Sequence, residues 1–170
     1  MSKLCKTVVT LLLSTYGGAS HQTEQLCLDS TYKPGAYFEY KTVIIPKDET
    51  KFRGGEDSAD GSDTLLIVAD GVGGWGEMGV DPGFFSRRLT ENGVNTLIDS
   101  PVTIRSALTP LTIGCKSAES EFMGSATVVS VLIEDADHIN TANLGDCGYA
   151  LYEVTEDGSR LRNKFVSQSK

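Results

Sequence analysis

Carboxylates stand where apolar stretches of this chain end, and these residues have the type and spacing to do chemistry. Asp70 closes the apolar run 64–70 (TLLIVAD) and is followed directly by Gly71. Burying a lone carboxylate at such a position is costly unless its charge is compensated. A carboxylate beside an unobstructed glycine carbonyl offers the oxygen ligands that hard cations such as Mg²⁺ and Mn²⁺ prefer.

Two further acidic positions repeat this pattern. Glu56 and Asp57 precede the same apolar run, so an antiparallel return of the chain would bring them level with Asp70. Asp146 follows another strand-like stretch, residues 138–144 (HINTANL). Acids at the ends of separate strands predict a metal site at one edge of a sheet. The alternative is a set of turn and cap aspartates, which are common in loops.

The glycines after Asp70 allow a rival interpretation. Residues 71–76 (GVGGWG) match G-x-G-x-x-G after a strand, a pattern typical of dinucleotide-binding turns. In such a site the last glycine lies in the helix whose N-terminus faces the pyrophosphate. Here the helix start signal, Asp81-Pro82, comes later, and Asp70 would repel the phosphates. A nucleotide site is therefore not expected.

Apolar and β-branched runs between turn residues predict the elements that must position these acids. Strands are expected over residues 36–45, 64–70, 125–133, 138–144, 149–154 and 161–167. Helices are expected over residues 82–98 and 102–123, the second broken or kinked at Pro110. The last four strands would form an antiparallel meander with turns at Asp137 and residues 157–158. Strands, then helices, then strands indicate an α+β fold.

Composition excludes several classes of protein. The chain has 170 residues, with 15 Lys and Arg against 23 Asp and Glu, and its formal net charge is −8. Nonspecific binding to nucleic acid or anionic membranes needs a basic face, so neither partner is expected. No apolar run approaches the roughly 18 residues that indicate a transmembrane helix. The 4 cysteines are scattered and only 2 histidines occur, which argues against zinc clusters and dense disulfide frameworks.

The N-terminal residues allow two interpretations. Residues 1–23 contain no Asp or Glu, and Lys3 and Lys6 precede the apolar run 8–13 (VVTLLL). This composition suits a targeting segment over residues 1–22, either a short secretory signal or an organelle transit peptide. The alternative is a short buried strand or helix at the start of the domain.

Five sequence blocks follow one another in a fixed order. They are GED at 55–57, VADGVGGW at 68–75, GVDPGFFS at 79–86, GSATVVSVL at 124–132 and TANLGDCGYALY at 141–152. Together they resemble the metal-dependent type 2C (PPM) Ser/Thr protein phosphatases, and within them the branch that includes the mitochondrial matrix phosphatases. The resemblance begins at about residue 36, and the segment before it matches nothing.

This resemblance implies an antiparallel β-sandwich flanked by helices, with a two-metal site for Mg²⁺ or Mn²⁺ at one end. Asp70 corresponds to the carboxylate that bridges the metals, and Gly71 to the residue whose carbonyl binds one of them. Glu56 and Asp57 match an acidic pair that supports the site, and Asp146 matches an aspartate linked to a weaker third metal. The implied reaction is attack of a metal-activated water on phosphoserine or phosphothreonine of a phosphoprotein substrate, without a covalent intermediate.

Departures from the family pattern also matter. Val72 stands where many members have a histidine proposed to protonate the leaving group. Phe52 stands where many have a phosphate-binding arginine. The adjacent Arg53 is interpreted as a surface basic residue, with a phosphate ligand as the alternative.

The blocks that carry the family's later metal-binding aspartates do not occur, so residues 36–170 resemble roughly the N-terminal half of the domain. A non-catalytic phosphatase-like protein that binds a cation or a partner is therefore the alternative to an enzyme. The resemblance implies a mitochondrial compartment, with secretory and cytoplasmic locations as alternatives.

Overall fold

The computed structural model describes the backbone of residues 6–12, 26–29, 37–99, 106–134, 138–154 and 161–168, and side chains within 37–97, 106–134 and 138–152. The strands are β1 (Lys6–Leu12), β2 (Leu26–Asp29), β3 (Tyr37–Glu39), β4 (Asp57–Gly61), β5 (Leu65–Gly71), β6 (Ala126–Ile133), β7 (Ile139–Leu144), β8 (Gly148–Val154) and β9 (Leu161–Gln168). The helices are α1 (Pro82–Asp99) and α2 (Leu108–Glu121), and the short 3-10 helices are η1 (Lys51–Arg53) and η2 (Gly73–Met78).

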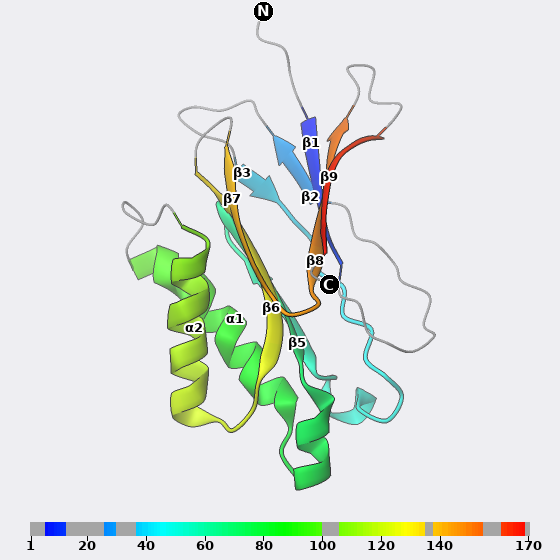
Figure 1. Ribbon diagram of the computed structural model, residues 1–170, viewed down its shortest axis with the longest axis vertical. Helices are drawn as coiled ribbons and strands as arrows, with labels where there is room; N and C mark the ends of the chain where they lie inside the picture. The colour runs from blue at the N-terminus through cyan, green and yellow to red at the C-terminus, as the bar shows by residue number, and fades with distance from the viewer. Residues whose placement is uncertain are drawn as a thin grey trace, which may run out of the picture.

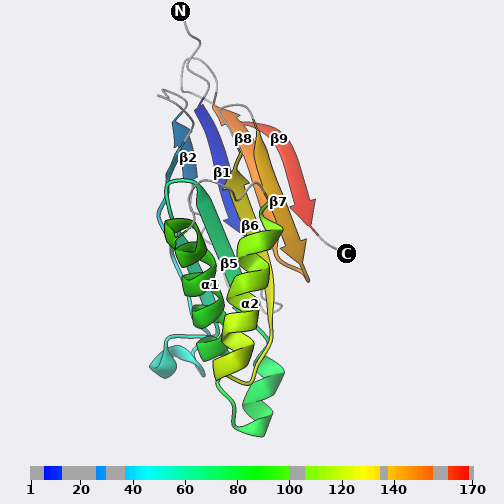
Figure 2. The same ribbon diagram turned by 90° about the vertical axis from the view of Figure 1, so that its left-hand side faces the viewer.

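These elements form layers (Figure 1). One sheet has the strand order β4-β5-β6-β7 and the other the order β3-β2-β1-β8-β9, and neighbouring strands are antiparallel. Helices α1 and α2 lie side by side on one face of the four-stranded sheet, and the five-stranded sheet lies on its other face (Figure 2). This is an α+β fold, an antiparallel sandwich flanked by helices, as the sequence predicted.

Side-chain alternation along β5 explains how the layers hold together. Successive side chains of a strand point to opposite faces. Leu65, Ile67 and Ala69 pack into the cluster formed with α1 and α2. Leu66 and Val68 pack into the cluster formed with β3 and β8. Because both faces of β5 are covered, its sequence is apolar without alternation.

Helix α1 begins where its capping residues predicted. The Gly83 N–H donates a hydrogen bond of 2.9 Å to Oδ1 of Asp81, and Pro82 occupies the first helical position. The two helices approach closely at Gly114 on α2, where a Cβ would collide with the Leu89 carbonyl oxygen on α1. The start of α1 lies beside the end of β5, because a Cβ at Gly71 would lie 3.0 Å from the Pro82 carbonyl oxygen.

Three expectations about the elements were wrong. The strand expected over 36–45 is only β3, because residues 41–45 are exposed and lie in no strand. Helix α2 begins at Leu108, so Pro110 lies in the first turn, where a missing N–H does not kink a helix. The meander is divided between two sheets after β7, where Gly145 has a φ of +88° that suits glycine. The expected turns at 137 and 157–158 lie outside the described residues.

The N-terminal segment contributes a central strand to the five-stranded sheet. Strand β1 pairs with β2 on one side and with β8 on the other. Residues 1–5 and 13–22 lie outside the described part of the chain, and a targeting segment over 1–22 stays a prediction. None of the described helices has the length and apolar character needed to cross a membrane.

Candidate metal centre

Asp57 and Asp70 face each other at one end of the four-stranded sheet. Asp57 begins β4, Asp70 stands near the end of β5, and the antiparallel register makes them direct partners. By alternation they share the face of Ala59 and Val68, which packs toward the five-stranded sheet. The two carboxylates therefore lie at the end of the layer between the sheets.

Like charges placed directly opposite each other in a sheet are destabilising unless a proton or a cation intervenes. The pKa of Asp70 is raised to about 7, first by burial and then by its hydrogen bond to Asp57 and the charges of Asp57 and Asp146. Burial also raises the pKa of Asp57, against the opposing effects of the hydrogen bond to Asp70 and the charge of Lys47. Below about pH 7 the pair therefore shares a proton that resides on Asp70.

Gly71 stands at a crowded position that keeps Asp70 in register. Its N–H donates a hydrogen bond of 3.1 Å to the Glu56 carbonyl oxygen. A Cβ here would lie 2.5 Å from that oxygen and 3.0 Å from the Pro82 carbonyl oxygen. A side chain would force the backbone apart, so glycine is required for the close contact of β5 with the start of β4 and of α1.

The loop after Gly71 is tied to the residues that lead into β6. The Val72 N–H donates to the carbonyl oxygen of Ser125 at 2.9 Å. The Trp75 indole N–H donates to the Ser125 hydroxyl, also at 2.9 Å. Ser125 thus fixes η2 in place with both its backbone and its side chain. No sequence pattern marks this role, because Ser125 looks like an ordinary residue at a strand start.

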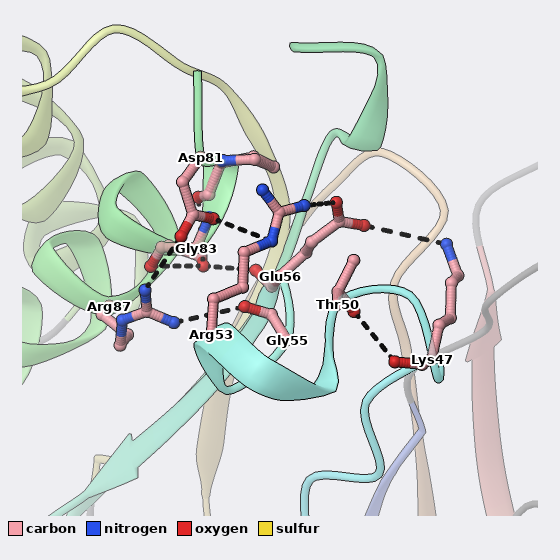
Figure 3. A network of polar contacts seen from close by, with 10 residues as sticks. Lys47, Thr50, Arg53, Gly55, Glu56, Asp81, Gly83 and Arg87 are labelled. Atoms are coloured by element: carbon pink, nitrogen blue, oxygen red, sulfur yellow. Dashed lines mark hydrogen bonds and ion pairs between the residues drawn. The ribbon is translucent and has the colours of Figure 1, made fainter. Parts of the chain in front are cut away.

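Glu56 is buried and lies between two cations (Figure 3). Its Oε1 accepts a hydrogen bond of 2.8 Å from Nη2 of Arg53, and its Oε2 lies 3.8 Å from Nζ of Lys47. The Glu56 charge is therefore balanced within the protein.

Arg53, interpreted from the sequence as a surface basic residue, is partly exposed and is engaged by the fold. Its side chain is only 25% exposed, and its Nε lies 3.7 Å from Oδ1 of Asp81. Two carboxylates, Glu56 and Asp81, compensate the charge of the partly exposed guanidinium. On the other side of Asp81, Arg87 donates a hydrogen bond of 3.3 Å to the Gly55 carbonyl oxygen (Figure 3). This network joins the loop before β4 to the start of α1.

Asp146 lies just after β7 and is exposed, and its charge acts on Asp70. The neighbouring Cys147 is buried, with Sγ 3.1 Å from Oγ1 of Thr127, which is the strand partner of Asp70. Burial, with the charges of Asp70 and Asp146, raises the pKa of the Cys147 thiol to about 11. In the metal-free protein the thiol is therefore neutral at physiological pH, and a neutral thiol is a poor nucleophile.

The structure brings together only part of the predicted ligand set. Asp57 and Asp70 meet and Gly71 follows them directly, whereas Glu56 faces its two cations and Asp146 lies nearby. Within the side chains that the structure describes, no three His, Cys, Asp or Glu residues converge as a metal cage. Two facing carboxylates still fit a divalent cation, because Mg²⁺ and Mn²⁺ take oxygen ligands and complete their coordination with water.

Several known proteins are similar in sequence to this chain. No family model matches the chain. "Probable protein phosphatase 2C 55" of Arabidopsis thaliana is 33% identical over 130 residues, which are 75% of this chain and 26% of that protein. "Protein phosphatase PTC7 homolog fig" of Drosophila yakuba is 38% identical over 137 residues, which are 76% of this chain and 42% of that protein. The chain thus spans less than half the length of these relatives.

A solved structure is also similar in part. The X-ray structure of the photosystem II phosphatase PBCP matches with a TM-score of 0.43 and 22% sequence identity. The match covers 65% of this chain and 63% of that one.

Proposed function

Because this chain belongs to the type 2C family of protein phosphatases, we propose that its Asp57–Asp70 end is part of a metal-dependent protein serine/threonine phosphatase site. The observation that carries the proposal is the strand pair itself. Two half-buried carboxylates are direct partners at a sheet end, and the pKa of Asp70 is raised to about 7, chiefly by burial. A divalent cation would relieve the repulsion that their pairing causes.

Mg²⁺ or Mn²⁺, when bound, would supply an activated water at neutral pH and offset the charge of the phosphoryl oxygens. The Asp57 and Asp70 carboxylates would hold the cation in their deprotonated form, so they would release their shared proton when it binds. Gly71 keeps Asp70 opposite Asp57 through its crowded contact with Glu56. Val72 is exposed and cannot donate a proton, so water or another group would protonate the leaving oxygen.

The proposed substrate is a phosphoserine or phosphothreonine side chain of a protein, as expected for the family. The similarity to PTC7 homologues supports a mitochondrial compartment as part of the same proposal. Imaging of the tagged protein against mitochondrial, secretory and cytoplasmic markers would test the compartment. A secretory or diffuse cytoplasmic pattern would contradict it.

One observation favours a second candidate function. Among the described side chains the structure brings two acidic residues together and no third one close enough to complete a cage. Such a centre suits a non-catalytic phosphatase-like protein that binds a cation. This alternative predicts Mn²⁺ binding without turnover.

Both candidates are tested by following phosphate release from a phosphothreonine peptide with and without Mn²⁺. The enzyme proposal predicts Mn²⁺-dependent release that Asp70→Asn abolishes. Asp63→Asn is a suitable control, because Asp63 is an exposed residue near the opposite end of β5. Mn²⁺ binding without phosphate release would favour the second candidate, and release without any metal would contradict both.

A further inference from the structure

Three cations lie around the acidic end of the sheet, and the protein engages them to different degrees. Arg53 hydrogen-bonds to Glu56 and lies beside Asp81, with its side chain mostly buried. Arg87 hydrogen-bonds to the Gly55 carbonyl oxygen and stacks 5.2 Å from the ring centroid of Phe84. Both guanidinium groups therefore have structural partners. Lys47 is held more loosely.

The Lys47 ammonium lies 3.8 Å from Oε2 of Glu56, which is an ion pair but too long for a good hydrogen bond. The side chain is 53% exposed. Its backbone is nevertheless fixed, because the Thr50 N–H donates to the Lys47 carbonyl oxygen at 3.0 Å. The Thr50 hydroxyl donates to the same oxygen at 3.3 Å (Figure 3). The fixed backbone thus places an exposed ammonium group beside the carboxylates at this end of the sheet.

The charge of Lys47 also reaches the carboxylate pair. Burial raises the pKa of both Asp57 and Asp70, and the positive charge of Lys47 opposes that rise at each of them. The position that a phosphate-binding arginine would take is held by Phe52, which is 86% exposed and carries no charge. Among the described basic residues near the Asp57–Asp70 pair, Lys47 is therefore the one held most loosely.

We propose that Lys47 binds the phosphoryl oxygens of the substrate at the Asp57–Asp70 centre. This inference rests on the proposed phosphatase function and adds the residue that recognises the phosphate. A lysine ammonium is a compact charge with three N–H donors on a flexible stem, which suits a phosphate dianion. At 3.8 Å from Glu56, the ammonium can turn to such an anion without breaking a hydrogen bond of the fold.

The assignment predicts that removing the Lys47 charge has opposite effects on phosphate binding and on Mn²⁺ binding. Replacing Lys47 with an uncharged residue should weaken phosphate binding, because a charged donor is lost. The same replacement should strengthen Mn²⁺ binding, because a positive charge beside the carboxylates is removed. A residue that served only the fold would produce neither pattern.

Calorimetry on the full chain can measure both effects, first with Mn²⁺ and then with inorganic phosphate added to the Mn²⁺-loaded protein. In Lys47→Met the phosphate dissociation constant should rise about tenfold, since a charge-assisted hydrogen bond is lost. Its Mn²⁺ affinity should rise by up to about fivefold, the size expected for removing one charge at this range in a solvated site. Lys47→Arg should stay near the unmodified protein.

Lys51→Met is the matched control, because Lys51 is an exposed lysine of η1 close by in the chain. It should leave both constants unchanged. Equal phosphate affinity in Lys47→Met and the unmodified chain, with Mn²⁺ still bound, would overturn the Lys47 assignment alone. Failure of the unmodified chain to bind Mn²⁺ would overturn the proposed function and this inference together.

Discussion

The two faces of the β4–β5 pair differ sharply at the same level of the sheet. On the helix-covered face, Ser58 meets Thr90 of α1 through a buried hydrogen bond of 2.7 Å between their hydroxyl oxygens. On the other face, one residue away, Asp57 lies opposite Asp70. Two hydroxyl groups satisfy each other because each can donate and accept, whereas two carboxylates can only accept. The first pair is complete within the protein, and the second requires a proton or a cation.

The same contrast extends along the helix-covered face. Ser130 of β6 is fully buried, and its hydroxyl donates to the Ala107 carbonyl oxygen at 2.8 Å. Ser86 of α1 donates in the same way to the Glu56 carbonyl oxygen. Neutral groups with complete hydrogen bonds stabilise the fold here. The Asp57–Asp70 pair lacks such complete hydrogen bonds. A departure of this kind is typical of a functional site.

The largest expected effect concerns the apolar core of the helix-covered face. Leu89 of α1 is 1% exposed within that cluster. Leu89→Ala should lower the free energy of unfolding by about 2–5 kcal/mol, through lost burial and the cavity left behind. Urea unfolding measures it, with Ile113→Ala on the exposed side of α2 as the control. A cost below that of the control would mean that this face does not supply the stability.

Gly71→Ala tests the close contact of β5 with the starts of β4 and α1. The added methyl group would collide with the Glu56 and Pro82 carbonyl oxygens, so we expect a loss of about 1–3 kcal/mol in unfolding free energy. The shift of β5 should also weaken Mn²⁺ binding. Gly74→Ala is the control, because a Cβ there meets nothing within 4 Å. Similar stability of both variants would contradict the crowding described at Gly71.

Ser125→Ala tests how firmly the loop beside the carboxylates is held. Loss of the Trp75 hydrogen bond should cost about 1 kcal/mol and expose the indole to water. Trp75 is the only tryptophan of the chain, so its fluorescence should shift to longer wavelength in the variant. Protease cleavage within 72–79 should become faster. Emission identical to that of Ser120→Ala, an exposed serine of α2, would show that Ser125 does not order this loop.

The smallest effect is the dependence of stability on pH. Burial raises the pKa of Asp70 to about 7 in the folded chain, above its ordinary value of 3.8. Between these two pH values the folded state binds more protons than the unfolded state, so metal-free stability should fall as pH rises. The effect should be modest, because Asp70 is partly exposed and solvent screens its charge.

Thermal unfolding at several pH values between 4 and 8 would measure this slope. It should be reduced in Asp70→Asn, where the titrating group is absent. Mn²⁺ should remove the fall in stability near neutral pH, since it binds the deprotonated pair. Stability that rises steadily across this range in the metal-free protein would contradict the pairing of the two acids.

Much of this arrangement could be predicted from the sequence because it depends on local patterns. The apolar run before Asp70 marked β5, and the pair Asp81-Pro82 marked the start of α1. The closeness of Glu56 and Asp57 to that run suggested the antiparallel return that brings Asp57 level with Asp70, although the strand β4 itself was not expected.

Other features depend on tertiary contacts that no local pattern contains. Periodicity identifies a strand but does not say which sheet it joins, so the change of sheet between β7 and β8 was missed. Arg53 and Lys47 looked like residues of a polar surface loop. Their places beside Glu56 follow from the path of that loop across the start of β4.

The central claim is that the Asp57–Asp70 pair binds a divalent cation, and calorimetric titration with Mn²⁺ tests it most directly. The chain should bind Mn²⁺ near neutral pH with release of protons, and Asp70→Asn should abolish the binding because half of the paired charge is lost. Asp63→Asn should bind as the unmodified chain does. Unchanged Mn²⁺ affinity in Asp70→Asn would contradict the account and leave Asp70 as a strand residue without a metal role.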